Sequence, residues 1–332
     1  MQLSWRSILF CGFLASMLAW ADSAFAQVGN RNFIDPIITQ DPNPSNELDI
    51  TPMAYADAQL HAFSLEADME KQFSANLSID AAFNYVYPTC DNPHTTGCTP
   101  TPIGRRSHRK ITRTRKRSET KKKAAIGNPQ ELAAGFGNPE FLGKWAFYAS
   151  DRHELRLAIG VDAIIAAGNY EAGANTHNYV GPVLMLAKGM GDLPDRGWLR
   201  FLRPFALQAD GGTLTKTSGA TANIVYSDAD LSYQLSYLHD FVRGMAGVPQ
   251  WLSALTPFAE FSYAGEFNGS VGVAPQFTLL PGIAYSQGAF QYSFASMFAL
   301  NQASVPFNHV IFMGLIDIAL DELYPIFGRT LF

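Results

Sequence analysis

Between residues 62 and 87, apolar and polar residues alternate at every second position. Phe63, Leu65 and Met69 fall on one face of this stretch, and the pattern resumes over residues 77–87 after a short polar break. A period of two is produced by β-strands, because successive side chains point to opposite faces of the pleat. Two such strands separated by a few polar residues predict an antiparallel hairpin.

The same alternation recurs along the rest of the chain. Further runs lie at residues 47–51, 140–149, 155–163, 178–188, 199–210, 224–238, 256–266, 272–286, 289–300 and 309–320. Strands of about ten residues, apolar on one face and small or polar on the other, are typical of a transmembrane β-barrel. Charged residues make up 16% of the chain, against roughly 25% in soluble domains. The best candidate for a spanning helix, residues 310–320, is too short and contains Asp317.

Short and long links alternate between the predicted strands. The links are tight at residues 70–76, 150–153 and 286–288, and longer at 88–138, 167–177 and 211–223. Bacterial barrels keep short turns in the periplasm and long loops outside. Counting the weak strand at 47–51 gives an all-β, antiparallel transmembrane barrel of about twelve strands, with both chain ends in the periplasm. Ten and fourteen strands are the alternatives.

The two ends of the chain predict export to the bacterial outer membrane. Residues 1–26 have a basic start, an apolar centre and a small-x-small site ending at Ala26, which predicts a cleaved signal peptide. Residues 27–45 are predicted to be an extended periplasmic leader, 46–320 the barrel and 321–332 a tail. The chain ends in Phe332, a residue common at the end of outer-membrane barrels. We therefore expect the barrel-assembly machinery to recognise Phe332.

A strongly basic run lies within the predicted extracellular loop 88–138. Residues 104–123 contain six Arg and five Lys of the chain's 24 basic residues. In an exported barrel, the expected anion is the phosphate of lipopolysaccharide, which Arg binds bidentately, and not a nucleic acid. The candidate contacts are Arg105, Arg106, Arg109, Lys110, Arg113, Arg115, Lys116 and Arg117. The alternatives are a solvated loop of mutually repelling charges and a local reading-frame error.

Two cysteines follow the predicted signal peptide. Cys90 and Cys98 are separated by seven residues in an exported chain, which predicts a small loop disulfide. The alternative, a metal site with His94 and His108, fits no common ligand spacing.

The less apolar faces of the predicted strands carry charged residues that would line the lumen. These selectivity candidates are Glu66, Asp68, Glu70, Asp80, Asp162, Asp228, Asp230 and Glu260, together with Lys144 and Arg156. An acidic lumen disfavours anions and admits cations or neutral solutes. The alternative is that these groups form ion pairs that brace the wall.

The sequence contains no recognisable catalytic pattern. No His–Ser pair is followed by the Asn-Gly expected of outer-membrane phospholipases, and there is no Gly-rich phosphate loop or metal cluster. We therefore predict no enzyme activity, cofactor or metal.

Two stretches carry a resemblance to a known family. Residues 135–145 match the pattern G-x-G-[ND]-x-x-x-x-x-K-[YW], and residues 317–325 with the terminal GRTLF complete the similarity. Both stretches resemble the phenol-degradation meta-pathway family of outer-membrane barrels, whose members are often called transporters. The basic run 104–123 is a departure from that family. The resemblance implies a passage for small apolar or aromatic compounds. We expect a passive channel or porin for small compounds, aromatic or hydrophobic ones among them. The alternative is a structural or adhesion-type barrel with a closed lumen, whose basic loop binds lipopolysaccharide or another anionic surface.

Overall fold

In the computed structural model, the described residues are 27–28, 31–56, 61–89, 134–169, 174, 177–217, 223–242, 247, 249–267, 274–304 and 310–327. The predicted signal peptide, the Cys90 and Cys98 pair, the basic run 104–123 and Phe332 lie outside them. What the sequence predicts for those residues therefore stays a prediction.

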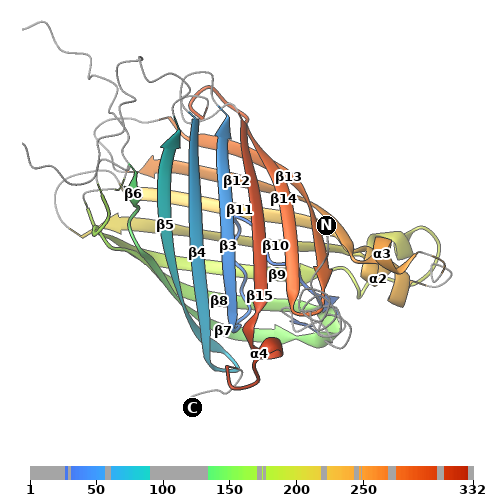
Figure 1. Cartoon of the computed structure of the whole chain (residues 1–332). Helices are drawn as coiled ribbons and strands as arrows, with labels where there is room; N and C mark the ends of the chain where they lie inside the picture. The colour runs from blue at the N-terminus through green and yellow to red at the C-terminus, as the bar shows by residue number, and fades with distance from the viewer. Residues whose placement is uncertain are drawn as a thin grey trace, which may run out of the picture.

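Among the described residues, twelve antiparallel strands close into a barrel (Figure 1). The strands are β3 (Glu47–Ala56), β4 (His61–Ser74), β5 (Leu77–Thr89), β7 (Glu140–Ser150), β8 (Leu155–Ile164), β9 (Tyr179–Gly189), β10 (Phe205–Lys216), β11 (Asn223–Tyr233), β12 (Leu255–Phe267), β13 (Gln276–Gln287), β14 (Phe290–Ala299) and β15 (Val310–Ala319). The last strand, β15, pairs with the first, β3, and this seam closes the barrel. Closure removes the free edges that lipid does not tolerate. The predicted twelve-stranded barrel is confirmed.

The connections distinguish the two ends of the barrel (Figure 1). At the short-turn end, residues 75–76 join β4 to β5, and η1 (Asp151–His153) joins β7 to β8. This end also carries η3 (Leu199–Leu202), α2 (Leu235–Phe241), α3 (Gln250–Ser253) and α4 (Leu320–Leu323). The last residues of β5 and β8 and the first residues of β7 and β9 lie at the opposite end, here called the long-loop end. Two short elements complete the chain: β1 (Gln27–Val28) pairs with β2 (Arg31–Asn32), and β6 (Gly135–Phe136) pairs with β5.

The two faces of the wall differ as the alternation predicts. On β9, Val180 and Leu184 are 39% and 57% exposed, whereas Val183 and Met185 point inward and are buried. Exposed apolar side chains continue around the barrel exterior, with Phe294 on β14 as an example. Soluble monomers rarely expose an apolar surface of this extent, so the exterior suits lipid. Among the described residues, no helix is both long and apolar enough to cross a membrane.

A β-bulge reverses the predicted facing of one residue. Strict alternation over residues 140–149 places Tyr148 on the inner face. The register between β7 and β8 shifts between Ala146 and Tyr148, so that Tyr148 pairs with Leu157. Tyr148 is therefore exposed on the outer face, because the extra residue of a bulge inverts the alternation that follows it.

The strand β11 ends earlier than the sequence predicts. The alternating pattern predicts a strand to residue 238, whereas β11 ends at Tyr233 and α2 follows. The partner strand β10 begins directly after Pro204, which has no N–H to extend the ladder. The chain then turns into a helix, and Tyr237 is buried instead of facing lipid.

The predicted periplasmic leader lies inside the barrel. Residues 33–46, here called the inserted segment, run into the lumen from the short-turn end and return to the start of β3. Phe33, Thr39 and Asn43 are almost fully buried there. The predicted position is therefore wrong. An extended segment leaves its own N–H groups unpaired, and the polar inner wall supplies acceptors that the sequence pattern alone does not reveal.

Candidate functional site

Arg31 anchors the chain at the short-turn mouth of the lumen. Its Nε lies 2.8 Å from Oε2 of Glu154, and its Nη1 donates to Oε1 of Gln234 at 2.9 Å. The guanidinium also lies over the ring of Tyr237, 4.2 Å from the ring centroid. Tyr237 donates to Oε1 of Glu154 at 3.0 Å. Burial, and then the nearby Glu154 carboxylate, raises the pKa of Tyr237. These contacts fix α2 against the turn between β7 and β8.

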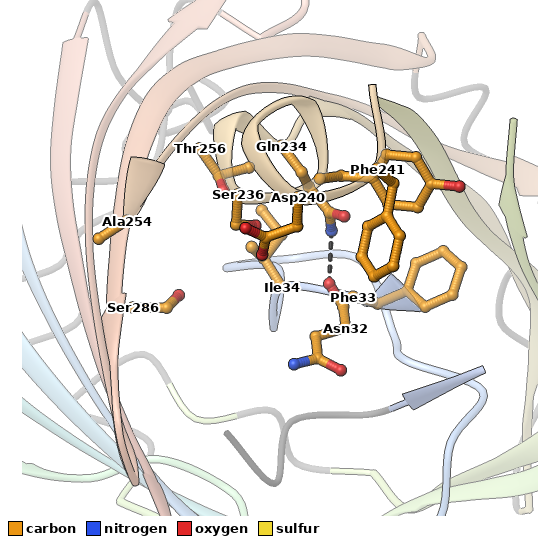
Figure 2. A pocket seen from close by; sticks show the side chains of 11 residues that line it. Asn32, Phe33, Ile34, Gln234, Ser236, Asp240, Phe241, Ala254, Thr256 and Ser286 are labelled. Carbon is orange, nitrogen blue, oxygen red and sulfur yellow. Dashed lines mark hydrogen bonds between the residues drawn. The ribbon is translucent and has the colours of Figure 1, made fainter. Parts of the chain in front are cut away.

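A cavity of about 180 Å³ lies beside this anchor (Figure 2). Its lining includes Ile34 from the inserted segment, Phe241 from α2 and Thr256 from β12. Gln234 donates from Nε2 to the carbonyl of Asn32 at 2.5 Å, the dashed line in Figure 2. This hydrogen bond between the Gln234 amide and the Asn32 carbonyl holds the start of the inserted segment in the short-turn mouth of the lumen.

Glu260 on β12 binds the tip of the inserted segment. Its carboxylate accepts from the backbone N–H groups of Ile37, Ile38 and Thr39 at 2.7, 2.9 and 2.9 Å, and from the Thr39 hydroxyl at 3.1 Å. The next N–H, that of Gln40, donates to Oδ1 of Asp210 on β10 at 2.8 Å. Four consecutive donors of the segment thus find carboxylate acceptors on the wall.

Lys144 and Glu70 bind the returning half of the segment. Lys144 on β7 lies 2.6 Å from Oε2 of Glu70 on β4, and both side chains are almost fully buried. Lys144 also donates to the carbonyl of Asp41 at 3.1 Å, while Glu70 accepts from the N–H of Ser45 at 3.0 Å. This ion pair braces the wall and at the same time fixes the segment.

Apolar contacts hold the first half of the segment. Ile34 packs with buried inner-wall residues of β12 to β15, and Ile37 and Ile38 pack against that cluster. The wall members are Phe258, Leu280, Ala284, Ala295, Ile311 and Met313. Gly282 permits this packing, because a Cβ there would come within 2.4 Å of the Phe258 ring.

A second cavity, of about 200 Å³, lies in the long-loop half of the lumen, next to the tip of the segment. Its apolar lining comes from Leu142, Ile164, Leu214, Ile224 and Tyr226, and its polar lining from Gln40, Glu140 and Asp162. The Tyr226 hydroxyl lies 3.4 Å from Oδ2 of Asp162. An apolar wall with carboxylates at its edge can receive a small ring and, beside it, a positive charge.

The predicted lumen candidates all lie at inward positions. Glu66, Asp68, Glu70, Asp80, Lys144, Arg156, Asp162, Asp228, Asp230 and Glu260 alternate with outward apolar residues on their strands. The structure joins Glu70 to Lys144 and places Asp230 opposite Glu260. Their role in selectivity stays a prediction.

Several inward charges were not among the candidates. They are Glu47, Asp49, Glu140, Asp210, Asp317 and Lys216 on the wall, and Asp35 and Asp41 on the inserted segment. The wall residues follow the same period of two, so extending the alternation through residues 47–51 and 310–320 would have found Asp49 and Asp317. The segment residues carry no periodic signal.

No family model matches the chain, and no curated protein matches it in sequence. Among solved structures, the chain is similar to the COG4313 outer membrane channel from Pseudomonas putida F1, with 12% identity and a TM-score of 0.45 over 86% of this chain and 99% of that one. It is also similar to the KdgM porin (7%, 0.43, 81% and 98%) and to the NanC porin (6%, 0.45, 82% and 98%). Similarities at this level identify neither a family nor a function for this chain, so its resemblance to the phenol-degradation family stays a prediction.

Proposed function

We propose that the protein is an outer-membrane channel for small cationic or neutral compounds, aromatic and hydrophobic ones among them. The closed wall with an apolar exterior supports the membrane setting. The arrangement of short turns, together with the first and last described residues, at one end of the barrel supports an orientation with this end in the periplasm.

The observation that carries the proposal is the cavity in the long-loop half of the lumen. Its volume of about 200 Å³ exceeds the roughly 150 Å³ of an apolar cavity that accepts benzene. Leu142, Leu214 and Tyr226 offer apolar contacts, while Glu140 and Asp162 place carboxyl groups, which can attract a cation, at the edge. A small aromatic cation therefore fits this cavity better than an aromatic anion.

The charge of the inner wall supports the same preference. Among the described residues, the inward cations of the strands are Lys144, Arg156 and Lys216, of which Lys144 is already paired with Glu70. The inward carboxylates are more numerous and come from every strand of the barrel except β9, β13 and β14. Such a lumen concentrates cations and repels anions.

Planar-bilayer recordings test this function with membrane-impermeant probes. Across a KCl gradient, we expect the full mature chain to give a reversal potential of the cation-selective sign. Benzyltrimethylammonium should reduce the potassium current at about a fivefold lower concentration than it does in Asp162→Asn, because one nearby charge contributes about 1 kcal/mol. Benzenesulfonate should have little effect on either protein. The matched control is Asp192→Asn, which removes a carboxylate from the short-turn end outside the lumen.

Two results would contradict the proposal. Anion selectivity would overturn the role of the acidic wall. A complete lack of conductance in correctly folded protein would favour the structural or adhesion-type barrel, since the inserted segment would then close the lumen. In that case, binding of lipopolysaccharide should be compared between the whole chain and a chain lacking residues 104–123.

A further inference from the structure

Three aspartates face one another across neighbouring strands at the seam of the barrel. In the pairing register, Asp49 on β3 lies opposite Asp317 on β15 on one side and opposite Asp68 on β4 on the other. Like charges directly opposite in a sheet destabilise it. The closing strand β15 therefore places an aspartate opposite another aspartate. A residue that attracts its cross-strand neighbour would normally be expected at this position.

The inserted segment adds a further carboxylate at the same point. The amide of Gln291 on β14 binds the backbone of Asp35 twice, accepting from its N–H at 3.1 Å and donating to its carbonyl at 2.6 Å. With the backbone fixed in this way, the Asp35 side chain reaches the seam. Carboxylate oxygens of Asp35, Asp49 and Asp317 all lie within 4.8 Å of one another.

Asp317 has no partner for its charge within the described residues. It is fully buried, and neither of its carboxylate oxygens accepts a hydrogen bond. Oδ1 of Asp49 and Oδ1 of Asp68 are buried without a partner as well. Lys144 lines a third cavity of the lumen together with Asp35, Asp49 and Asp68, but it is engaged by Glu70. A buried carboxylate without a donor or cation is costly, so this position calls for a bound cation.

We propose that Asp35, Asp49 and Asp317 form a calcium site that fastens the inserted segment to the seam of the barrel. The three ligands are carboxylate oxygens, which hard divalent cations prefer. Two oxygens on opposite sides of Ca²⁺ are about 4.6–5.2 Å apart, whereas around Mg²⁺ they are about 4.0–4.2 Å apart. Oxygens that all lie within 4.8 Å of one another are close enough to bind a single calcium ion. Asp68 and Glu47 line the same cavity and can supply further oxygens.

The site joins two parts of the chain. Asp49 and Asp317 belong to the wall, while Asp35 belongs to the segment that occupies the lumen. A bound ion therefore stabilises both the β3–β15 pairing and the position of the segment. This inference concerns ion binding and does not depend on whether the barrel conducts.

Calcium titration calorimetry tests the site directly. The full mature chain, refolded in detergent without lipopolysaccharide, is titrated with calcium chloride and, separately, with magnesium chloride. We expect calcium to bind with a dissociation constant below about 1 mM and magnesium to bind more weakly. Asp317→Asn should weaken calcium binding at least about tenfold, the effect of losing one charged ligand worth about 1.4 kcal/mol. Calcium should also raise the unfolding temperature of the unaltered chain, but not that of Asp317→Asn.

Asp230→Asn is the matched control. Asp230 is also fully buried, with neither oxygen hydrogen-bonded, but it lies opposite Glu260 on the other side of the barrel. Its substitution should leave calcium affinity unchanged. Equal affinity in Asp317→Asn and the unaltered chain, or no calcium binding at all, would overturn the site and leave protons shared between the carboxyl groups as the explanation. If Asp35→Asn binds calcium like the unaltered chain, the fastening of the segment is overturned. Asp→Asn changes remove repulsion, so these variants should fold.

Discussion

Glu260 and Asp317 are both fully buried carboxylates on the inner wall, yet their surroundings are opposite. Glu260 accepts from three successive backbone N–H groups, those of residues 37–39. Asp317 has no partner on either oxygen and lies opposite Asp49. The inserted segment makes the difference, because it presents N–H groups to Glu260 and another carboxylate, Asp35, to Asp317. Whether a buried acid in this lumen stabilises or destabilises the fold therefore depends on the groups that the inserted segment places beside it.

The largest effect is expected where a carboxylate is neutralised by a cation of the chain itself. Lys144→Met leaves Glu70 and its acidic neighbours buried without their cation. Breaking a buried ion pair from one side should lower the free energy of unfolding by about 3 kcal/mol, measured by urea unfolding from lipid vesicles. Lys188→Met, which removes a partly exposed pair with Asp192, should cost about 0.5 kcal/mol. If both variants lost a similar amount of unfolding free energy, burial would not make the Lys144–Glu70 pair more important than the partly exposed pair.

Glu260→Gln should have the next largest effect. The amide keeps the shape of the side chain but loses the charge, and its NH₂ group cannot accept from the N–H groups of the segment. Hydrogen bonds to charged acceptors are stronger than neutral ones, so we expect a loss of about 2 kcal/mol in the free energy of unfolding. The inward neighbour Asp228 serves as the control, since Asp228→Asn should cost less than half as much. An unchanged Glu260→Gln protein would show that water replaces these contacts.

Asp317→Asn should change stability in the opposite direction. In buffer with a calcium chelator, removing one of several facing charges should raise the free energy of unfolding by about 0.5–1 kcal/mol. Calcium should then reverse the order of the two proteins, because it stabilises the unaltered chain alone. A loss of stability in chelator would mean that the Asp317 carboxylate has a favourable partner after all.

The smallest effect is expected at Asp192, a carboxylate outside the lumen. Slight burial raises the pKa of Asp192, but hydrogen bonds from Lys188 and His153 outweigh it and lower the pKa below its usual range. A depressed pKa adds stability above the unfolded value, and this contribution is lost as the pH falls. The unaltered chain and Asp192→Asn should therefore differ by at most about 0.5 kcal/mol at pH 7, and the difference should begin to decrease as the pH falls below about 4. If the difference in unfolding free energy between the two proteins grew as the pH fell, the lowered pKa of Asp192 would be contradicted.

The local sequence pattern predicts each side of the barrel wall well, but it fails where the chain departs from regular pairing. Alternation places Glu66, Asp80 and Glu260 inward correctly. It misplaces Tyr148, because whether a strand bulges depends on its pairing with β8 and not on its own residues. It also extends β11 too far, because the end of a strand is set by its partner, here by Pro204 before β10.

The sequence by itself determined the class of fold, the number of strands and the inner and outer faces. These follow from the period of two and from link lengths, which are local properties of the chain. Only the tertiary structure decided that residues 33–46 lie in the lumen and that Asp35, Asp49 and Asp317 meet. The physical reason is distance along the chain: the wall groups that bind residues 35–40, and the strand that closes the seam, come from more than 160 positions away, as Asp210 and Gln291 do. No local pattern records which of these distant groups become neighbours.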